Sequence, residues 1–285
     1  MPSNDEHIME ACGKARIVVR KGKVIDVGPT LLKACPLAIK FSQPVIKFTK
    51  EEIALNVEDR IKRVGMFTKD REILSNDDFV AFGASELICS GMKRGILDCA
   101  VVACDGAGTV ITASPQLVQG IGGRMSGLVK TSPIKEVIMR LEANGGKVLD
   151  PDNAAINQLD GMRLAQKEGF RRIAVTVTDP MDAEAIRKCN PGAIILGVHL
   201  TGITKEGAER MVAFADIVSG CASKWIREIA GKAALLQAGA SVPVFALTGE
   251  GKNLIVEKIK ETQQRLLVKI EKLPYVNKKC PDPLV

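Results

Sequence analysis

From residue 97 onward, short apolar runs alternate with amphipathic segments, and only short polar stretches separate them. Continuous apolar runs of this length are typical of strands buried on both faces of a sheet. We predict strands at residues 97–104, 172–178, 193–199, 216–219 and 242–247. Alternating strands and helices with short connections favour an α/β fold, with a mostly parallel, doubly wound sheet that helices cover on both faces.

Apolar spacing and helix-start signals predict helices at residues 132–146, 153–169, 180–189, 204–214, 223–239 and 251–273, between and after these strands. Before them, residues 16–19 and 24–27 flank Gly22 and predict a β-hairpin. A capping-box pattern at Thr49–Glu52 starts a helix expected to end near Gly65, and a further helix is expected from Ser85 to Gly95. We therefore divide the chain into an N-terminal hairpin lobe, residues 1–48, and an α/β domain, residues 49–285.

Charge and composition narrow the classes of partner. The chain of 285 residues has 40 Lys and Arg against 33 Asp and Glu, a net charge of +7. The excess lies at the two ends, and no aromatic residues are interleaved with the basic ones, so we expect a solvated basic surface and no nucleic-acid partner. No apolar run approaches the roughly 20 residues of a membrane span, and the first residues do not resemble an export signal. The sequence predicts a cytoplasmic protein without a membrane span, and therefore thiols or metal ligands rather than disulfides for its eight cysteines.

Small and polar residues follow the predicted strands directly. In a parallel sheet the carboxyl ends of the strands meet at one edge, where ligands bind. We therefore expect these side chains to converge on one rim, with Asp105 and His199 as candidate catalytic groups and others as candidate ligand contacts: Gly106, Gly108, Thr109, Thr201, Ser223 and Lys224. Two alternatives stay open at this point. His199 is as compatible with a structural role, and Asp179, Thr204 and Thr248 are favoured as simple helix caps.

Residues 120–127 contain four glycines, an arginine and a serine. Backbone N–H groups of such a loop could hold an anion, with Gly122, Gly123, Arg124 and Ser126 as contacts. The spacing fails the dinucleotide fingerprint, and the Gly-Lys pairs of the chain lack the Ser or Thr of a phosphate-binding loop. An anion-binding loop and a flexible lid over the rim fit the pattern equally well.

Several strings of this sequence resemble the methanogenesis marker protein 8 family, and the resemblance spans nearly the whole chain. They are residues 16–27, 34–37, 65–68, 78–86, 104–111, 119–127, 199–202 and 221–224. The resemblance implies a setting in methane-metabolising archaea and an accessory role in the maturation, activation or cofactor supply of methyl-coenzyme M reductase, with that enzyme or its activation machinery as partner. It supplies no reaction.

Cys35, Cys104 and Cys221 fall inside the family-like strings. Three thiolates with an open fourth position could hold an iron–sulfur cluster or another metal, which makes these residues candidate ligands. Two functions are therefore carried forward. One is the accessory protein that binds a ligand, metal or partner at the rim. The other is an enzyme acting on a small anionic metabolite, with His199 or Asp105 as acid or base and Arg124 or Lys224 holding the anion.

Overall fold

The computed structural model describes residues 5–125, 127–276 and 280–285, and it shows a mixed α/β protein with two sheets. The larger sheet has the strand order β11-β12-β10-β9-β8-β4-β5-β7. Its four central strands are parallel to one another: β4 (Cys99–Cys104), β8 (Ile173–Val177), β9 (Ile194–Gly197) and β10 (Ile217–Ser219). These are four of the five strands that the apolar runs predict.

The outer strands make the sheet mixed rather than mostly parallel. They are β5 (Gly108–Thr112) and β7 (Gly146–Val148) on one side, and β12 (Val244–Ala246) and β11 (Leu236–Ala238) on the other, and each pairs antiparallel with its neighbour. The predicted strand at 242–247 is therefore present, as β12, with the opposite direction. The expectation of a doubly wound parallel sheet holds only for the centre.

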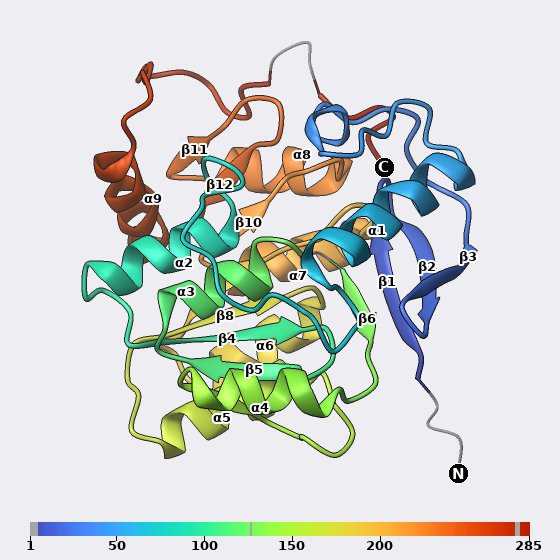
Figure 1. Ribbon diagram of the computed structural model, residues 1–285. Helices are drawn as coiled ribbons and strands as arrows, with labels where there is room; N and C mark the ends of the chain where they lie inside the picture. The colour runs from blue at the N-terminus through green and yellow to red at the C-terminus, as the bar shows by residue number, and fades with distance from the viewer. Residues whose placement is uncertain (1–4, 126, 277–279) are drawn as a thin grey trace.

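Helices cover both faces of the larger sheet, as expected (Figure 1). On one face α2 (Ala84–Lys93), α4 (Lys135–Ala143) and α9 (Gly249–Glu261) pack against side chains such as Val102 and Leu196. On the other face α5 (Gln158–Lys167), α6 (Pro180–Cys189), α7 (Lys205–Phe214) and α8 (Lys224–Ala233) pack against Val101 and Ile195. Adjacent strand residues point to opposite faces, which is why one apolar run fills both cores.

A tight hairpin explains why β5 runs antiparallel to β4. Gly106 and Gly108 both have positive φ, and a Cβ at Gly108 would lie 2.3 Å from the carbonyl oxygen of Ala154. Only glycine fits such a left-handed position with backbone that close. The small residues after β4 therefore turn the chain back into the sheet, rather than forming an open loop at its edge.

A second, four-stranded sheet has the order β3-β2-β1-β6. The N-terminal segment supplies β1 (His7–Ala11), β2 (Ala15–Arg20) and β3 (Lys23–Val27), and β6 (Leu128–Lys130) comes from the other side of the proposed boundary at residue 48. A short 3-10 turn, η1 (Ala38–Lys40), and α1 (Lys50–Val64) pack beside it. Thr49 caps α1 and Gly65 ends it in a left-handed conformation, as the sequence predicts.

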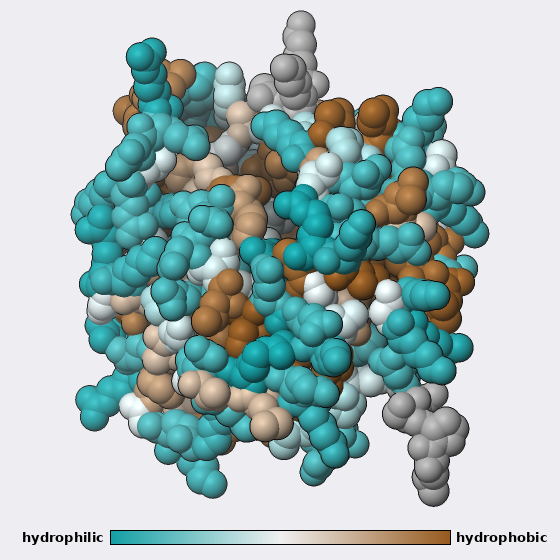
Figure 2. Space-filling view, in the orientation of Figure 1, coloured by the Kyte–Doolittle hydropathy of each residue, from teal (hydrophilic) through white to brown (hydrophobic). Residues whose placement is uncertain are grey.

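The remaining elements are short. Helix α3 (Pro115–Leu117) leads into a π-helical turn, η2 (Val118–Gly122). The last helix ends at Glu261, earlier than predicted, and the segment after it exposes Leu267, Val268 and Ile270. None of the helices in the described residues combines the length and the apolar character that a bilayer span requires. Hydrophilic residues cover most of the face that Figure 2 displays, with hydrophobic residues in small patches.

Candidate functional site

A cavity of about 660 Å³ lies over the carboxyl halves of β8, β9 and β10, on the α2 face of the larger sheet. Strand residues form its floor and the start of α2 forms one wall. The lining residues on the side of the smaller sheet are Leu37, Lys40, Gly122, Gly123, Met125, Gly127 and Leu128. This is the edge at which ligands bind in sheets with parallel strands. A cavity of this volume is large enough for a cofactor-sized molecule.

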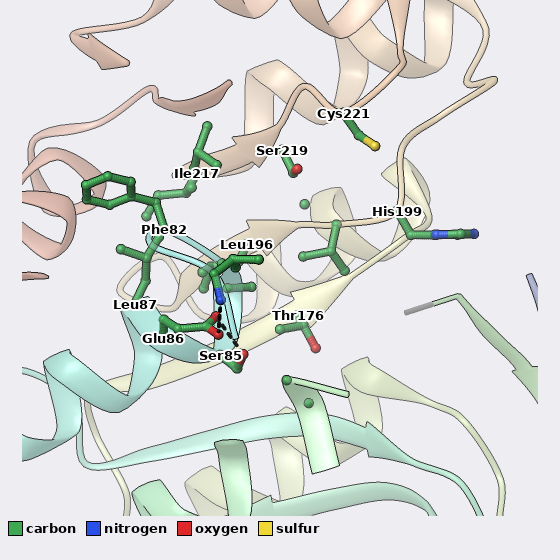
Figure 3. A pocket seen from close by; sticks show the side chains of 18 of the residues that line it. Phe82, Ser85, Glu86, Leu87, Thr176, Leu196, His199, Ile217, Ser219 and Cys221 are labelled. Atoms are coloured by element: carbon green, nitrogen blue, oxygen red, sulfur yellow. Dashed lines mark hydrogen bonds between the residues drawn. The ribbon is translucent and has the colours of Figure 1, made fainter. Parts of the chain in front are cut away.

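The cavity has an apolar end and a polar end (Figure 3). Phe82, Leu87 and Ile217 line the apolar end beside α2, and His199 and Cys221 lie at the other end. Thr176 and Ser219 present hydroxyl groups between them. Among the described residues that line the cavity, Lys40 is the one basic side chain, and it is exposed. The lining therefore suits a ligand with a largely apolar body and a few hydrogen-bonding groups.

Hydrogen bonds to the buried carboxylate of Glu86 stabilise the wall at the apolar end of the cavity. Glu86 is 1% exposed, and its carboxylate accepts hydrogen bonds from the backbone N–H groups of Phe79 (3.0 Å) and Val80 (3.2 Å), from the hydroxyl of Ser85 (2.9 Å) and from the amide of Gln119 (3.0 Å). A buried carboxylate is tolerated when donors satisfy both oxygens in this way. Glu86 thus fixes the segment before α2 in the shape that forms the cavity wall.

At the polar end, His199 meets a carboxylate from the other sheet. Its Nε2 lies 3.0 Å from Oε2 of Glu10 in β1, and the ammonium of Lys14 lies 2.9 Å from the same oxygen. Burial lowers the pKa of His199, although the hydrogen bond that the imidazole donates to Glu10 opposes that effect. The imidazole is therefore neutral near pH 7. Because Nε2 faces a carboxylate, it carries the ring proton, and Nδ1 is the basic atom.

The backbone around His199 is shaped for this contact. His199 has φ +58°, a left-handed conformation that is uncommon for any residue other than glycine. A Cβ at Gly127, also in positive φ, would lie 2.4 Å from Nε2 of His199. The backbone N–H of Glu10 donates to the carbonyl of Gly127 at 2.7 Å. Such strain at a cavity edge is typical of functional positions, since ordinary packing does not require it.

Cys221 and Thr201 also line the cavity, as the sequence predicts for the rim. Burial raises the pKa of the Cys221 thiol, and a hydrogen bond with Thr201 partly opposes this shift. Cys35 packs with Cys221 in the core of the smaller sheet. Cys104 is fully buried in a different core, and its thiol donates to the carbonyl of Asp105 at 3.3 Å. The structure does not bring the three candidate metal ligands together.

Within the described parts of the chain, no group of three or more His, Cys, Asp or Glu side chains is placed to hold a metal ion. All eight cysteines are free thiols. The three cysteines that the sequence suggests as ligands of an iron–sulfur cluster therefore do not form a donor set for one.

Asp105 lies away from the cavity lining. It is fully buried, and its carboxylate pairs with the equally buried guanidinium of Arg71 at 2.8 Å and accepts the backbone N–H of Phe67 at 2.7 Å. This pair joins the turn after β4 to the segment after α1. A carboxylate engaged in this way has a structural task, and it does not share a pocket with His199.

The hairpin residues that follow Asp105 have structural partners too. The backbone N–H of Gly106 donates to Thr131 at 2.7 Å, and the hydroxyl of Thr109 donates to Gln158 at 2.8 Å. Thr109 is fully buried. These residues were candidate ligand contacts because they follow a strand, yet they bind other parts of the chain.

The glycine-rich segment reaches the cavity only in part. Gly122 and Gly123 line it, whereas Arg124 pairs with Glu72 and lies over the ring of Phe79, 5.3 Å from its centroid. Ser126 lies outside the described residues. The segment therefore works as a wall of the cavity, and its arginine is already engaged on the outside of that wall.

The caps behave as the simpler interpretation of the sequence expects. Asp179 caps α6 and Thr204 caps α7. Ser223, which the sequence predicts as a ligand contact, instead caps α8 and lies outside the cavity lining. Thr248 caps α9 and binds Asp216 at 2.7 Å, at the edge opposite the rim, because β12 runs antiparallel. Lys224 lies 5.0 Å from the centroid of Trp225 rather than in the cavity lining.

Sequence reasoning missed Glu10 and Glu86, which organise the two ends of the cavity. Glu10 lies in a strand that no apolar run in the sequence indicates. Glu86 looks like an ordinary acidic residue in the first turn of a helix. Glu86 does fall inside one of the family-like strings, residues 78–86, and that was the available signal.

Together, the fold and the site define a mixed α/β protein with a ligand-sized cavity where a parallel strand group meets a smaller sheet. Residues 7–260 match a family described as an uncharacterized protein conserved in archaea (DUF2099), and the chain belongs to this family. It is 44% identical, over 284 residues, to the uncharacterized protein MJ0054 of Methanocaldococcus jannaschii. That alignment covers 99% of this chain and all of the relative. No solved structure matches the chain.

Proposed function

We propose that the protein binds a small molecule in the cavity and acts as an accessory protein of methanogenesis, in the maturation, activation or cofactor supply of methyl-coenzyme M reductase. The observation that carries the binding role is the cavity of about 660 Å³, with the Glu10–His199 pair at one end and the wall held by Glu86 at the other. The setting in methanogenesis rests on the sequence strings that resemble the marker protein 8 family. The relative in M. jannaschii agrees with an archaeal setting.

The lining favours a particular ligand chemistry. With one exposed lysine and a neutral imidazole among the described lining residues, the cavity offers little fixed positive charge. A ligand with an apolar body would bury it against Phe82, Leu87 and Ile217, and its polar groups would face Thr176, Ser219 and His199. An anionic group on such a ligand would sit near Lys40, the exposed lysine of the lining.

A gene deletion in a methanogen, complemented with variants, tests this role. Ser219→Leu places a larger side chain in the cavity, and Gln166→Leu makes an equally apolar change at an exposed position of α5. We expect deletion to lower reductase activity in anaerobic extracts, Gln166→Leu to restore it, and Ser219→Leu to fail at equal protein abundance. Full restoration by Ser219→Leu would overturn the cavity's part in this role. Unchanged reductase activity on deletion would overturn the link to the reductase.

The enzyme alternative keeps one specific observation in its favour. A neutral histidine whose ring proton faces a carboxylate is the usual arrangement of a general base. His199 would be that base, with Glu10 orienting it, whereas Asp105, Arg124 and Lys224 lie away from the cavity lining. A His199→Ala strain that grows on methane-forming substrates as well as wild type would remove this alternative.

A further inference from the structure

Residues 128–132, which we call the strap, belong to the smaller sheet and reach the wall of the cavity. Their first three residues are β6, which pairs with β1 at two positions, Ile8 with Lys130 and Met9 with Leu128, with a register shift between them. Leu128 lines the cavity. A wall segment held by so short and irregular a ladder depends on the side-chain contacts that supplement it.

A buried histidine makes those contacts at the far end of the strap. His7 of β1 is 0% exposed, and its Nδ1 lies 2.7 Å from the hydroxyl oxygen of Thr131 and accepts the backbone N–H of Ser132 at 3.4 Å. Its Nε2 lies 2.9 Å from the carboxylate of Asp5. Because Nδ1 accepts a backbone N–H, the ring proton is on Nε2 and is donated to Asp5. The Thr131 hydroxyl accepts the backbone N–H of Gly106 at 2.7 Å, so it donates its own proton to Nδ1.

Protonation of His7 changes the atom that faces the strap. A second proton on the ring goes to Nδ1, which can then no longer accept a hydrogen bond. The Thr131 hydroxyl can adapt by rotating, but the backbone N–H of Ser132 then faces another N–H. A buried N–H that loses its acceptor is costly, so a protonated ring favours a strap that has moved into contact with water.

The surroundings of His7 keep the ring neutral while the strap is in place. Among the described residues, the charged groups around it are three carboxylates and the cations paired with two of them: Asp5; Glu6 with Arg20 and Lys130; and Asp105 with Arg71. The carboxylates raise the pKa of His7, but burial lowers it by more. A ring that reaches water regains an ordinary histidine pKa, so acidification favours the released strap.

We propose that the strap is a pH-sensitive gate of the cavity, which neutral His7 holds closed and which opens when Nδ1 takes up a proton. Opening moves Leu128 out of the cavity wall, so that a ligand enters or leaves more readily at acid pH. This regulation rests on the proposed function, because it requires that the cavity hold a ligand.

Hydrogen–deuterium exchange of the full-length protein, followed by mass spectrometry and corrected for the intrinsic effect of pH on amide exchange, tests the gate. Peptides that contain β8 serve as the internal reference. We expect exchange of the strap to rise roughly tenfold relative to β8 between pH 7.5 and pH 5.5. The chain has two histidines, which supply a matched pair of variants. The rise should disappear in His7→Gln, whose amide cannot take up the proton, and persist in His199→Gln.

Corrected exchange of the strap that does not change with pH in the wild-type protein would overturn the proposal, and so would a rise that persists in folded His7→Gln. If His7→Gln does not fold, the wild-type protein decides alone. The rise should begin near pH 6.5, the ordinary pKa of histidine, and level off where the His7 ring titrates in nuclear magnetic resonance spectra. A rise that continues below that titration overturns the role of His7. These measurements use no ligand, so a failed gate leaves the binding role of the cavity to its own test.

Discussion

Nε2 of His199, directly after β9 of the larger sheet, lies 3.0 Å from the carboxylate of Glu10 in β1 of the smaller one. The two residues are 189 positions apart in the sequence, and their contact joins the two sheets at the edge of the cavity. It fixes the ring proton of the imidazole on Nε2. The smaller sheet therefore contributes to the chemistry of the site as well as closing it.

Replacing Glu10 with Gln should lower the pKa of His199 further. The hydrogen bond that His199 donates to Glu10 raises the pKa of the imidazole against the stronger effect of burial. Its loss therefore leaves the effect of burial less opposed. Titration of the imidazole by nuclear magnetic resonance measures the change, and Glu6→Gln, a substitution in the same segment, is the control. An unchanged His199 pKa in Glu10→Gln would show that the contact does not exist in solution.

The same carboxylate should contribute to stability in a defined pH window. The hydrogen bond with His199 helps to lower the pKa of Glu10 to about 2 from its ordinary value of 4.5. A lowered carboxylate pKa stabilises the fold above about 4.5, and this contribution is lost as the pH falls toward 2. The wild-type protein should therefore exceed Glu10→Gln in free energy of unfolding at pH 6, with the difference shrinking at acid pH in urea titrations. A difference that does not depend on pH would contradict this.

Both histidines should make the protein less stable as the pH drops below 6.5, the ordinary pKa of a histidine side chain. Burial lowers the pKa of His7 and of His199, so the unfolded chain binds more protons than the folded one in this range. The free energy of unfolding should fall from pH 7.5 to pH 5, and His7→Gln should have a shallower slope than wild type. A stability that rises on acidification across this range would show that the histidines are not buried as described.

Asp105→Asn should be strongly destabilising, because it leaves the Arg71 guanidinium buried without its counter-charge. Breaking a buried ion pair from one side costs about 3–5 kcal/mol. Denaturant titration measures this, and Asp160→Asn, which breaks the exposed pair with Arg163, is the matched control with an expected cost below about 1 kcal/mol. A loss for Asp105→Asn as small as that of the control would reopen the residue as a functional candidate.

Gly108→Ala should destabilise the protein far more than Gly145→Ala. Both glycines have positive φ, which alone costs an alanine about 1–2 kcal/mol, but the Cβ at Gly108 would also meet backbone 2.3 Å away, whereas that at Gly145 meets nothing within 4 Å. Thermal unfolding of the two variants compares them. Equal melting temperatures would mean that the β4–β5 turn is looser than described, and would restore a ligand-binding interpretation of this glycine.

The centre of the fold could be predicted from the sequence because buried strands leave a local signal. Residues 97–104, 172–178, 193–199 and 216–219 became β4, β8, β9 and β10, and the segments between them contain the expected helices. Strand direction could not be predicted, because it depends on which partner a strand finds. From sequence alone, residues 106–108 look like an open polar loop. Only the structure shows that the backbone of Ala154 packs closely against this turn.

The candidate site, too, could be predicted only where its residues have a local sequence signal. Parallel strands brought His199, Thr201 and Cys221 to the cavity, as their position after strands implies. Asp105 also follows a strand, but its carboxylate binds Arg71 and the backbone of Phe67, which lie more than 30 residues earlier in the sequence. Glu10 could not be found from sequence, since its partner is determined only by how the two sheets pack.

The proposed function requires that the cavity hold a small molecule. The direct measurement is a native mass spectrum of the protein purified without oxygen from a methanogen that expresses it, for wild type, Ser219→Leu and Gln166→Leu. We predict that wild type and Gln166→Leu show the polypeptide mass plus one small molecule, and that Ser219→Leu shows the polypeptide mass alone. Bare polypeptide in wild type, or the same added mass in Ser219→Leu, would contradict the assignment of the cavity as the ligand site.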